Sequence, residues 1–418
     1  MAEQYKGMTY LKNKLNVKRS RVLTRYEYYD MKAYIKDYSK ALPEGYQWLA
    51  GTLGWCTKAV DSLADRLTFR EFSHDNFDLN EIFRLNNPDV LYDSAILSAL
   101  IASCSFVYIS QDADGYPRLQ VIDGGNATGI MDPITGLLTE GYAVLQRDDN
   151  KKVILDAYFT AGKTEIFERG RRAGVYQTNA PYPLLVPIVF RPDAARAFGH
   201  SRISRSCMSI MQSALRTIKR SEISGEFYSY PQRYALGLDD EIEGSNKWKA
   251  TMSSMFTASR DEDGNLPQLG QFPQQSMSPY VEQLRMFASL FAGECGLTLD
   301  DLGFPQDNPS SAEAIKSAHE NLRLTASKAQ RTFGSGLLNV GYLAACVRDN
   351  YSFQRNQFYQ TRPEWEPIFT PDASMLSLIG DGAIKINQAM PGYFGKDNMR
   401  NLTGIPASEE PVVVDTEE

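Results

Sequence analysis

The stretch from Ser276 to Leu322 reads SMSPYVEQLRMFASLFAGECGLTLDDLGFPQDNPSSAEAIKSAHENL and orders three elements in succession. Ser278 and Pro279 are typical of a helix start, with serine as the N-cap and proline in the first turn. A segment without regular periodicity follows over residues 295–310. Ser310 and Glu313 then have the spacing of a capping box, which predicts the start of another helix. The stretch therefore predicts a helix, an irregular loop and a second helix.

The second helix is predicted to be long. Its apolar residues recur at helical spacing from Ile315 to Val347, so the helix would run from residue 311 to Asp349, about 39 residues or about 58 Å. Gly334, Gly336 and Gly341 lie in its second half and predict a bend there. A periodic helix of this length favours a protein that assembles with other copies over a small enzyme.

Upstream of the opening stretch, a further helix is predicted over residues 201–228, since apolar side chains recur at helical spacing until a proline ends the pattern. A small compact segment over 229–277 follows, with the strand-like RYALGL near its start. Two helices that flank such an insert can stand side by side and carry it at their tips.

In the amino-terminal half, the spacing of apolar residues changes once, from helical spacing to the alternation typical of strands. Residues 24–110 are predicted to be mainly helical, and the uncharged segment 94–111 is read as a buried helix that runs into the strand FVYIS, because it is short for a membrane span and rich in serine. After residue 111 the period becomes two, which predicts a series of strands joined by short turns (RLQVI, GYAVLQR, KKVILDAYF and TEIFERG). The fold class is therefore predicted to be α+β.

Composition places the chain among globular proteins. It has 418 residues, of which 43% are hydrophobic and 23% charged, enough for several sub-domains with their own core. The amino terminus lacks the apolar segment of a signal peptide. Five dispersed cysteines without a Cys-x-x-Cys pair predict free thiols in a reducing compartment, not a disulfide framework or a zinc site.

The charge is uneven along the chain. The net charge is −7, yet residues 1–40 hold ten Lys/Arg against four Asp/Glu, so the remaining 378 residues sum to −13. The basic start is interpreted as a solvated helical face, with contact to a polyanion as the alternative. An acidic body argues against tight, salt-driven binding of nucleic acid, which needs basic surface.

Two short motifs resemble binding loops but lack essential residues. Gly162-Lys163-Thr164 ends like a nucleotide-binding loop, but Ala157 stands where its first glycine belongs and strand periodicity follows, so a hairpin turn is predicted. The segments 110–121 and 259–270 resemble calcium-binding loops, but each starts with serine and ends without the bidentate glutamate. Both are predicted to be Asp-Gly turns, and neither a metal nor a cofactor is expected.

Catalytic residues are not evident. The chain has three histidines, and neither His74-Asp75 nor His200-Ser201 forms a recognised catalytic spacing, while His319 is interpreted as part of a solvated helix face. Ser335 has glycine on both sides but lies inside the predicted long helix, unlike a nucleophile elbow. We therefore expect no enzymatic activity.

The order of elements, together with two motifs, resembles the portal proteins of tailed double-stranded DNA bacteriophages, specifically the siphophage type. The matching segments are FGHSRISRSCMSIMQSALRTIKRSEISGEFYSYPQRYALG (residues 198–237) and the opening stretch (276–322). The shared features are a Gly-x-Ser-x-Ile start, a helix that ends in aromatic residues before PQRYALG, a Leu-Gly turn and the PSSAEAIK helix start. The resemblance covers about residues 25–405 in element order and is specific over about 195–350.

The resemblance implies a portal-like fold and its division. A basic arm (1–24) would precede a helical, then β-rich wing (25–200), and the two stem helices (201–228 and 278–294) would flank a small α/β clip (229–277). The tunnel loop (295–310) would lead into a long kinked wing helix (311–350), followed by the wing end with a short helical crown (351–405) and an acidic, disordered tail (406–418). The short crown departs from the family's pattern.

The resemblance also implies a function. A ring of twelve subunits in the virion would occupy one capsid vertex, pass double-stranded DNA without sequence preference during packaging and ejection, and nucleate head assembly. The implied partners are the terminase large subunit, the scaffold and major capsid proteins and the head–tail adaptor. The implied location is the virion, and the host cytoplasm during assembly, without membrane contact.

Two groups of residues follow from these assignments. The acidic and apolar side chains of the predicted tunnel loop would face DNA; they are Leu297, Leu299, Asp300, Asp301, Leu302, Phe304 and Asp307. No Lys or Arg occurs between residues 295 and 310, which suits weak contact with DNA. Apolar stem residues would contact neighbouring subunits; they are Met211, Leu215, Ile218, Tyr280, Leu284 and Phe287.

Two other classes of protein remain open at this point. A different ring-forming head–tail connector would have similar helices but lacks the order of stem, clip and stem. An enzyme with an unrecognised site would show a defined small-molecule pocket and a discrete activity.

The hairpin assignment of Gly162-Lys163-Thr164 makes a first prediction. Lys163→Ala should leave nucleotide binding and every activity of the chain unchanged, because a lysine outside a phosphate loop makes no phosphate contact. Binding of a fluorescent ATP analogue by the two proteins is the measurement. Loss of nucleotide-dependent activity in this variant alone would contradict the assignment.

Overall fold

The computed structural model describes residues 5–35, 51–229, 233–236, 268–271, 276–305, 317–369, 371 and 373–405. The chain forms two compact units: the larger contains residues 1–34, 53–211 and 289–418, and the smaller residues 35–52 and 212–288. Helices and strands are mixed in one chain, so the predicted α+β class is confirmed. No helix in the described ranges has the length and apolarity to cross a membrane.

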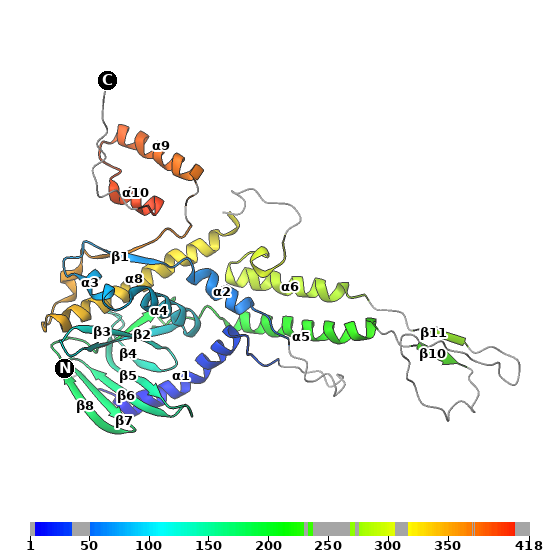
Figure 1. Ribbon diagram of the computed structural model, residues 1–418, viewed down its shortest axis with the longest axis horizontal. Helices are drawn as coiled ribbons and strands as arrows, with labels where there is room; N and C mark the ends of the chain where they lie inside the picture. Colours follow the sequence, from blue (N-terminus) through cyan, green and yellow to red (C-terminus); the bar gives the residue numbers. More distant parts are fainter. Residues whose placement is uncertain are drawn as a thin grey trace, which may run out of the picture. The chain divides into compact units, whose positions relative to one another are not determined.

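A three-stranded antiparallel sheet lies at the centre of the larger unit (Figure 1). Its order is β3 (Pro117–Asp123), β2 (Cys104–Gln111) and β9 (Leu185–Val189). Helix α4 (Pro88–Ala102) packs on β2 and β3, and α8 (Glu320–Arg348) packs on β9 and β2. The uncharged segment read as a buried helix running into a strand is therefore α4 followed by β2, as predicted.

Successive side chains of β2 contact different layers, as the period of two requires. Ser105 donates a hydrogen bond of 2.6 Å to the carbonyl oxygen of Ala95 in α4. On the other side the ring of Tyr108 lies 5.2 Å from that of Phe159, which belongs to a second sheet. Because both faces are covered, the first six residues of this strand are buried and its sequence shows no regular polar alternation.

The second sheet has five antiparallel strands in sequence order. Consecutive hairpins connect all of its members, namely β4 (Ala127–Met131), β5 (Leu138–Arg147), β6 (Val153–Thr160), β7 (Lys163–Glu168) and β8 (Arg171–Gln177). The turn between β6 and β7 contains Gly162 at φ +66°, and Lys163 begins β7. The predicted hairpin is confirmed, and no helix follows it to form a phosphate loop.

Short elements cover the remaining core of the larger unit. Helix α2 (Trp55–Ala64) packs on α4, and α3 (Leu79–Arg84) packs on α8. Strand β1 (Phe69–Ser73) pairs with β12 (Arg362–Trp365), although nearly 290 residues of chain separate them. A 3-10 turn, η4 (Arg355–Phe358), precedes β12.

Helix α8 is the predicted long helix, described from Glu320. The Ser310–Glu313 capping box lies outside the described residues. The glycines in its second half allow close packing: a Cβ added at Gly341 would lie 2.8 Å from Leu79 Cδ1, and one at Gly334 would lie 2.6 Å from Pro363 Cγ. Glycine at these positions therefore brings α3 and β12 directly against the helix backbone.

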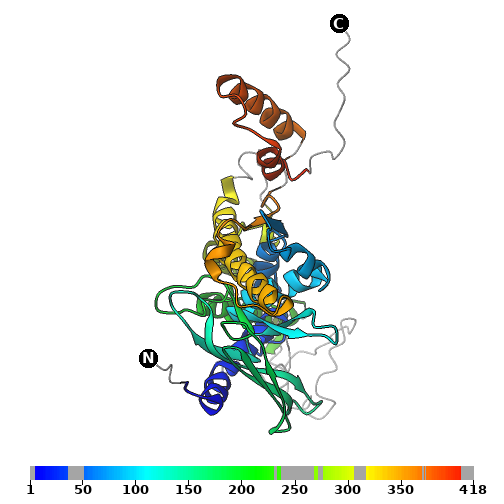
Figure 2. The same cartoon turned by 90° about the vertical axis from the view of Figure 1, so that its left-hand side faces the viewer.

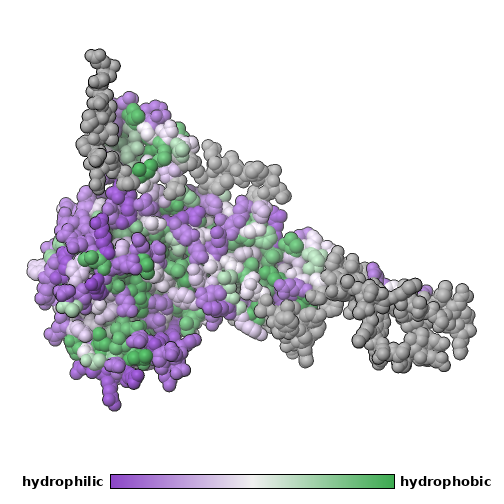
Figure 3. Space-filling model, viewed as in Figure 1, coloured by the Kyte–Doolittle hydropathy of each residue, from purple (hydrophilic) through white to green (hydrophobic). Residues whose placement is uncertain are grey.

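The carboxy-terminal helices α9 (Ala373–Ala389) and α10 (Lys396–Thr403) occupy the predicted crown. Arg400 of α10 forms an ion pair of 2.9 Å with Glu71 of β1. Leu378 is 70% exposed and Ile384 is 58% exposed, and green, apolar surface is visible over α9 in Figure 3. Helix α10 is thus joined to β1 by an ion pair, and α9 exposes apolar side chains.

The smaller unit contains most of two helices, α5 (Arg205–Ser229) and α6 (Ser278–Cys295), whose other ends belong to the larger unit. Between them in sequence, β10 (Arg233–Leu236) pairs antiparallel with β11 (Gln268–Gln271). The first four residues of the strand-like RYALGL, Arg233–Leu236, therefore form a strand, and Ser278-Pro279 begins a helix, as predicted. The rest of the 229–277 segment lies outside the described residues.

The amino-terminal region differs from the expected arm. Helix α1 (Met8–Tyr29) is continuous and packs against the five-stranded sheet and α4 (Figures 1 and 2). Its buried residues are Leu11, Leu15, Val22 and Tyr28. Basic residues separate these apolar positions in the sequence, which is why the segment is interpreted there as a solvated helical face. Tertiary packing of one narrow stripe makes it part of the wing.

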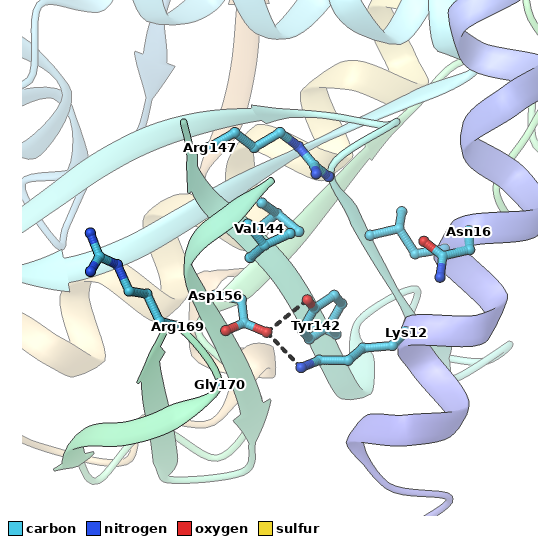
Figure 4. A pocket seen from close by; sticks show the side chains of 10 residues that line it. Lys12, Asn16, Tyr142, Val144, Arg147, Asp156, Arg169 and Gly170 are labelled. Carbon is cyan, nitrogen blue, oxygen red and sulfur yellow. Dashed lines mark hydrogen bonds and ion pairs between the residues drawn. The ribbon is translucent and has the colours of Figure 1, made fainter. Parts of the chain in front are cut away.

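A buried carboxylate joins α1 to the sheet (Figure 4). Asp156 of β6 is 2% exposed and lies 2.8 Å from the Lys12 ammonium of α1. The Tyr142 hydroxyl of β5 donates to the same carboxylate oxygen over 2.8 Å. Both partners are required, because a buried carboxylate left without them is costly.

The Asp156 cluster makes the second prediction. Asp156→Ala should lower the free energy of unfolding by roughly 2–3 kcal/mol, since it leaves a half-buried ammonium and a buried hydroxyl without their acceptor. Urea denaturation followed by circular dichroism is the measurement. Asp149→Ala, at the exposed turn of the same sheet, should change stability by less than about 0.5 kcal/mol. Equal effects of the two changes would contradict the anchoring role.

Candidate functional site

Helices α5 and α6 are the two helices predicted as the stem; they lie antiparallel, and polar contacts join them at two places. In the smaller unit Thr217 Oγ1 donates a hydrogen bond of 2.9 Å to Gln283 Oε1. In the larger unit Ser204 Oγ donates to Glu294 Oε1 over 2.9 Å. The two helices therefore lie side by side, with the start of α5 next to the end of α6 (Figure 1).

The structure divides the predicted stem contacts into two groups. Met211 and Leu215 are 2% and 3% exposed, so they are already buried within the chain and have little surface left for a neighbouring subunit. The other four, Ile218, Tyr280, Leu284 and Phe287, are half-buried.

The sequence analysis did not single out Val281 and Leu290, two of the three exposed apolar residues of α6 described here. Val281, Met286 and Leu290 are 61%, 49% and 54% exposed. Three large apolar side chains exposed on 18 residues of helix provide surface suited to association. Helical periodicity alone does not separate these exposed positions from the buried ones, because apolar residues occur at both.

The stem base is built around a buried guanidinium that the sequence analysis did not single out. Arg202 is 7% exposed. Its Nε donates to the carbonyl oxygen of Ala59 in α2 over 3.1 Å, and its Nη2 donates to the carbonyl oxygen of Cys295, the last residue of α6. Burial lowers the pKa of Arg202, because a charged group loses water in the interior.

Two thiols lie beside this guanidinium. The sulfurs of Cys207 in α5 and Cys295 in α6 are 3.4 Å apart, and both side chains are buried. Their hydrogen bond lowers the pKa of Cys207 and raises that of Cys295, because one sulfur holds the proton that the other accepts. Both cysteines are free thiols, as predicted.

The predicted tunnel loop is more ordered than its sequence suggests. Residues Asp300–Leu302 form a 3-10 turn, η3, and the backbone nitrogen of Phe304 donates to the carbonyl oxygen of Leu299 over 3.0 Å. Leu297 and Leu302 are buried, and Leu299 and Phe304 are half-buried. The apolar half of the predicted DNA-facing set therefore folds largely onto the protein itself.

The acidic residues of the loop have different environments. Asp301 accepts hydrogen bonds of 2.9 Å from the backbone nitrogen and the hydroxyl of Thr298. It also lies 3.8 Å from Nδ1 of His319, so this histidine neighbours a carboxylate and is not simply on a solvated face. Asp300 is exposed, and Asp307 lies outside the described residues. Asp300 is thus the loop carboxylate best placed to meet a passing ligand.

The pocket in Figure 4 lies between α1 and the five-stranded sheet and has a volume of about 330 Å³. Asp156 occupies its centre and is bonded to Lys12 and Tyr142 (Figure 4). Arg147 lines it as well and donates to Asn126 Oδ1 over 3.2 Å. The lining contains no serine, cysteine or histidine, so this pocket holds no pair of nucleophile and base.

The remaining candidate motifs also have structural roles. Asp112 accepts hydrogen bonds from the backbone nitrogens of Asp114 and Tyr116, which forms the predicted Asp-Gly turn. The imidazole of His200 lies 2.6 Å from Asp193, while the Ser201 hydroxyl donates to the carbonyl oxygen of Ile101. His200 and Ser201 are therefore not partners. Among the residues that the structure describes, no group of three metal-ligating side chains is found.

Comparison with known proteins gives relatives but no matching family model. The chain is 23% identical over 329 residues to the Portal protein of Mycobacterium phage L5, covering 73% of this chain and 67% of the relative. It is 23% identical over 330 residues to the Portal protein of Mycobacterium phage D29, with the same coverage.

Solved structures with a similar arrangement include the neck of an empty gene transfer agent particle, with a TM-score of 0.42 and 12% identity. The neck of a native particle has a TM-score of 0.42 and 14% identity; each match covers 85% of this chain and 90% of the other. The sequence matches carry the assignment. The chain is therefore similar in sequence to the portal proteins of Mycobacterium phages L5 and D29.

Proposed function

We propose that this chain forms a ring at one vertex of a phage capsid and serves there as the conduit through which duplex DNA is packaged and ejected. The homology to phage portal proteins carries this proposal. The paired stem helices support it, since α6 exposes apolar side chains that a neighbouring copy would cover. Twelve copies per ring is the number that the family resemblance implies.

The charge of the loop suits a conduit. DNA that slides must not be held, and binding to phosphates grows with each cation that displaces a counterion. Residues 295–305 contain Asp300 and Asp301 but no Lys or Arg. A ring of such loops would keep DNA centred by repulsion while contributing little binding energy. Asp300, Asp301 and Asp307 are therefore retained as proposed DNA-facing residues, with Asp300 the most exposed of those described.

The chain itself would supply the passage and docking surfaces, and the motor would belong to a partner. This division fits the hairpin assignment of Lys163 and the pocket lining described above. The terminase large subunit, the scaffold and capsid proteins and the head–tail adaptor are the partners that the proposal expects. Negative-stain imaging of the purified protein tests the ring directly: particles with an axial hole are expected, and a monodisperse monomer under all conditions would contradict it.

The exposed stem residues make the third prediction. The double substitution Val281→Asp and Met286→Asp should abolish ring formation while the subunit stays folded, because two carboxylates would have to be buried without partners at the interface. Leu284→Asp should act in the same direction, although its half-buried side chain adds a cost within the subunit.

Mass photometry and circular dichroism are the measurements for these stem variants. Ile134→Asp is the control, since Ile134 is 92% exposed on a turn of the five-stranded sheet. If the double variant forms rings as readily as this control, α6 does not provide the contact between subunits.

The loop charge makes the fourth prediction. Asp300→Lys in every subunit should slow packaging, and the defect should shrink as salt rises, because screening weakens contacts with phosphate. Asp301 is left unchanged, since its carboxylate holds the turn. Packaging velocity in assembled proheads is the measurement, and Asp381→Lys on α9, also exposed, is the charge-matched control. Wild-type velocity at low salt in correctly formed rings would remove Asp300 from the DNA path.

A further inference from the structure

A group of basic side chains gathers around Phe198, in the segment that joins β9 to α5. Lys14 and Lys18 lie one turn apart on α1, and their ammonium groups are 5.2 Å and 4.6 Å from the centre of the Phe198 ring. Two cations over one aromatic ring repel each other, and each is attracted to the face of the ring. The pKa of Lys14 is lowered first by burial and then by Lys18.

Four arginines extend this group. The pKa of Arg25, farther along α1, is lowered first by burial and also by the nearby charges of Arg21, Arg196 and Arg205. Arg196 lies in the same segment as Phe198, and Arg205 begins α5. We call the six residues the Phe198 patch; they are Lys14, Lys18, Arg21, Arg25, Arg196 and Arg205. All belong to the larger unit.

Neutral groups of the protein orient the patch but do not neutralise it. The ammonium of Lys14 donates to the carbonyl oxygen of Gly129 over 2.7 Å, and that of Lys18 contacts the Cys104 sulfur at 3.1 Å. Arg25 donates to the carbonyl oxygen of Ala102 over 3.1 Å, at the carboxyl end of α4, where a cation is favoured. A carbonyl or thiol fixes the direction of a cation and leaves its formal charge in place.

Asp193 and Asp123 are carboxylates near the patch, and each is hydrogen-bonded to another group, although Lys18 is close enough to Asp123 to favour its charged form. Asp193 is bonded to His200, and Asp123 accepts a hydrogen bond of 2.8 Å from Tyr26. Among the described residues, no carboxylate lies within 4.0 Å of any of the six basic groups. Holding six like charges together without a carboxylate in direct contact costs stability, and such a cost is typical of surfaces that bind an anion.

We propose that the Phe198 patch binds the phosphates of duplex DNA on the wing, apart from the loop at the stem. The α1 members occupy positions 14, 18, 21 and 25, one face of a helix over about 16 Å. A duplex of that length carries about nine phosphate charges, so it can contact the whole row. Four of the six cations are arginines, whose planar fork matches phosphate oxygens.

This inference rests on the proposed function, because it assumes a protein that meets DNA. It concerns a different surface, however. The Phe198 patch would hold DNA outside the passage, whereas the acidic loop would repel DNA within it. An acidic protein segment is the other macromolecule that such a surface could attract. Duplex DNA fits better, since one charge per 1.7 Å exceeds the density of an ordinary acidic segment.

The experiment uses the full-length protein and a fluorescein-labelled 20-base-pair duplex, with anisotropy measured from 50 to 200 mM salt. The test variant is Arg21→Gln with Arg196→Gln, two exposed side chains that remove two charges and leave the half-buried contacts intact. It should bind about tenfold more weakly, and the slope of log K against log salt should fall by about 1.8, since two phosphate contacts are lost.

The matched control is Arg169→Gln with Arg171→Gln, which removes two exposed cations from the β7–β8 turn. The control should bind duplex within about twofold of the unchanged protein. Equal weakening by test and control variants would overturn the proposal, and so would absence of duplex binding by the unchanged protein at 50 mM salt. A 20-residue polyglutamate that binds more tightly than the duplex would overturn it too, in favour of a protein partner.

Negative-stain images of all three proteins separate this inference from the proposed function. If all three proteins form rings and the test variant binds duplex as tightly as the unchanged protein, only the proposal for the Phe198 patch is contradicted. Absence of rings in the unchanged protein would contradict the ring proposal, whatever the duplex result.

Discussion

The side chain of Arg202 is the constraint on which the arrangement of the larger unit depends. Its guanidinium donates to carbonyl oxygens at α2 and at the end of α6, and its backbone nitrogen donates to the carbonyl oxygen of Leu100 in α4. The residue itself lies just before α5. One buried cation therefore fixes where four helices meet, and it does so through helix carbonyls without a carboxylate. A lysine could not replace it, because a single ammonium lacks the fork that reaches two acceptors in fixed directions.

This arrangement explains how the stem and the loop are positioned together. The start of α5 and the end of α6 meet at one point. Arg202, just before α5, and Cys207 of α5 both contact Cys295 of α6. The chain then turns at Gly296, whose φ of +64° suits glycine, and an added Cβ there would lie 3.2 Å from Asn321 Cβ, close to the start of α8. Through Asp301 and His319 the loop also contacts the residues before α8. The loop thus follows α6 directly and contacts the start of α8. We expect a displacement of either helix to move the loop.

Much of the fold follows from periodicity and turn chemistry, and the remainder depends on contacts distant in sequence. The period of two predicts the hairpins around Gly162, because each strand pairs with its neighbour in the chain. The pairing of β1 with β12 left no local signal. The basic residues of α1 made it look like a solvated arm, whereas burial of Leu11 and Leu15 against β5 makes it part of the wing. At the stem, apolar spacing predicted two helices but could not separate Met211, which is core, from Met286, which is surface. The loop over residues 295–310 was expected to be irregular. Its turn is held by hydrogen bonds between Thr298 and Asp301, and such a turn produces no periodic pattern of apolar residues.

The burial of all five cysteines has a consequence for the chemical durability of an assembled particle. Cys56, Cys104, Cys207, Cys295 and Cys346 are free thiols enclosed by the subunit. Where surfaces of two copies meet, an exposed thiol would lie at high effective concentration near reactive groups of the other copy. Oxidation outside a cell would then cross-link subunits that must remain able to shift. Enclosed sulfurs avoid this cross-linking between subunits when the surroundings change from reducing to oxidising.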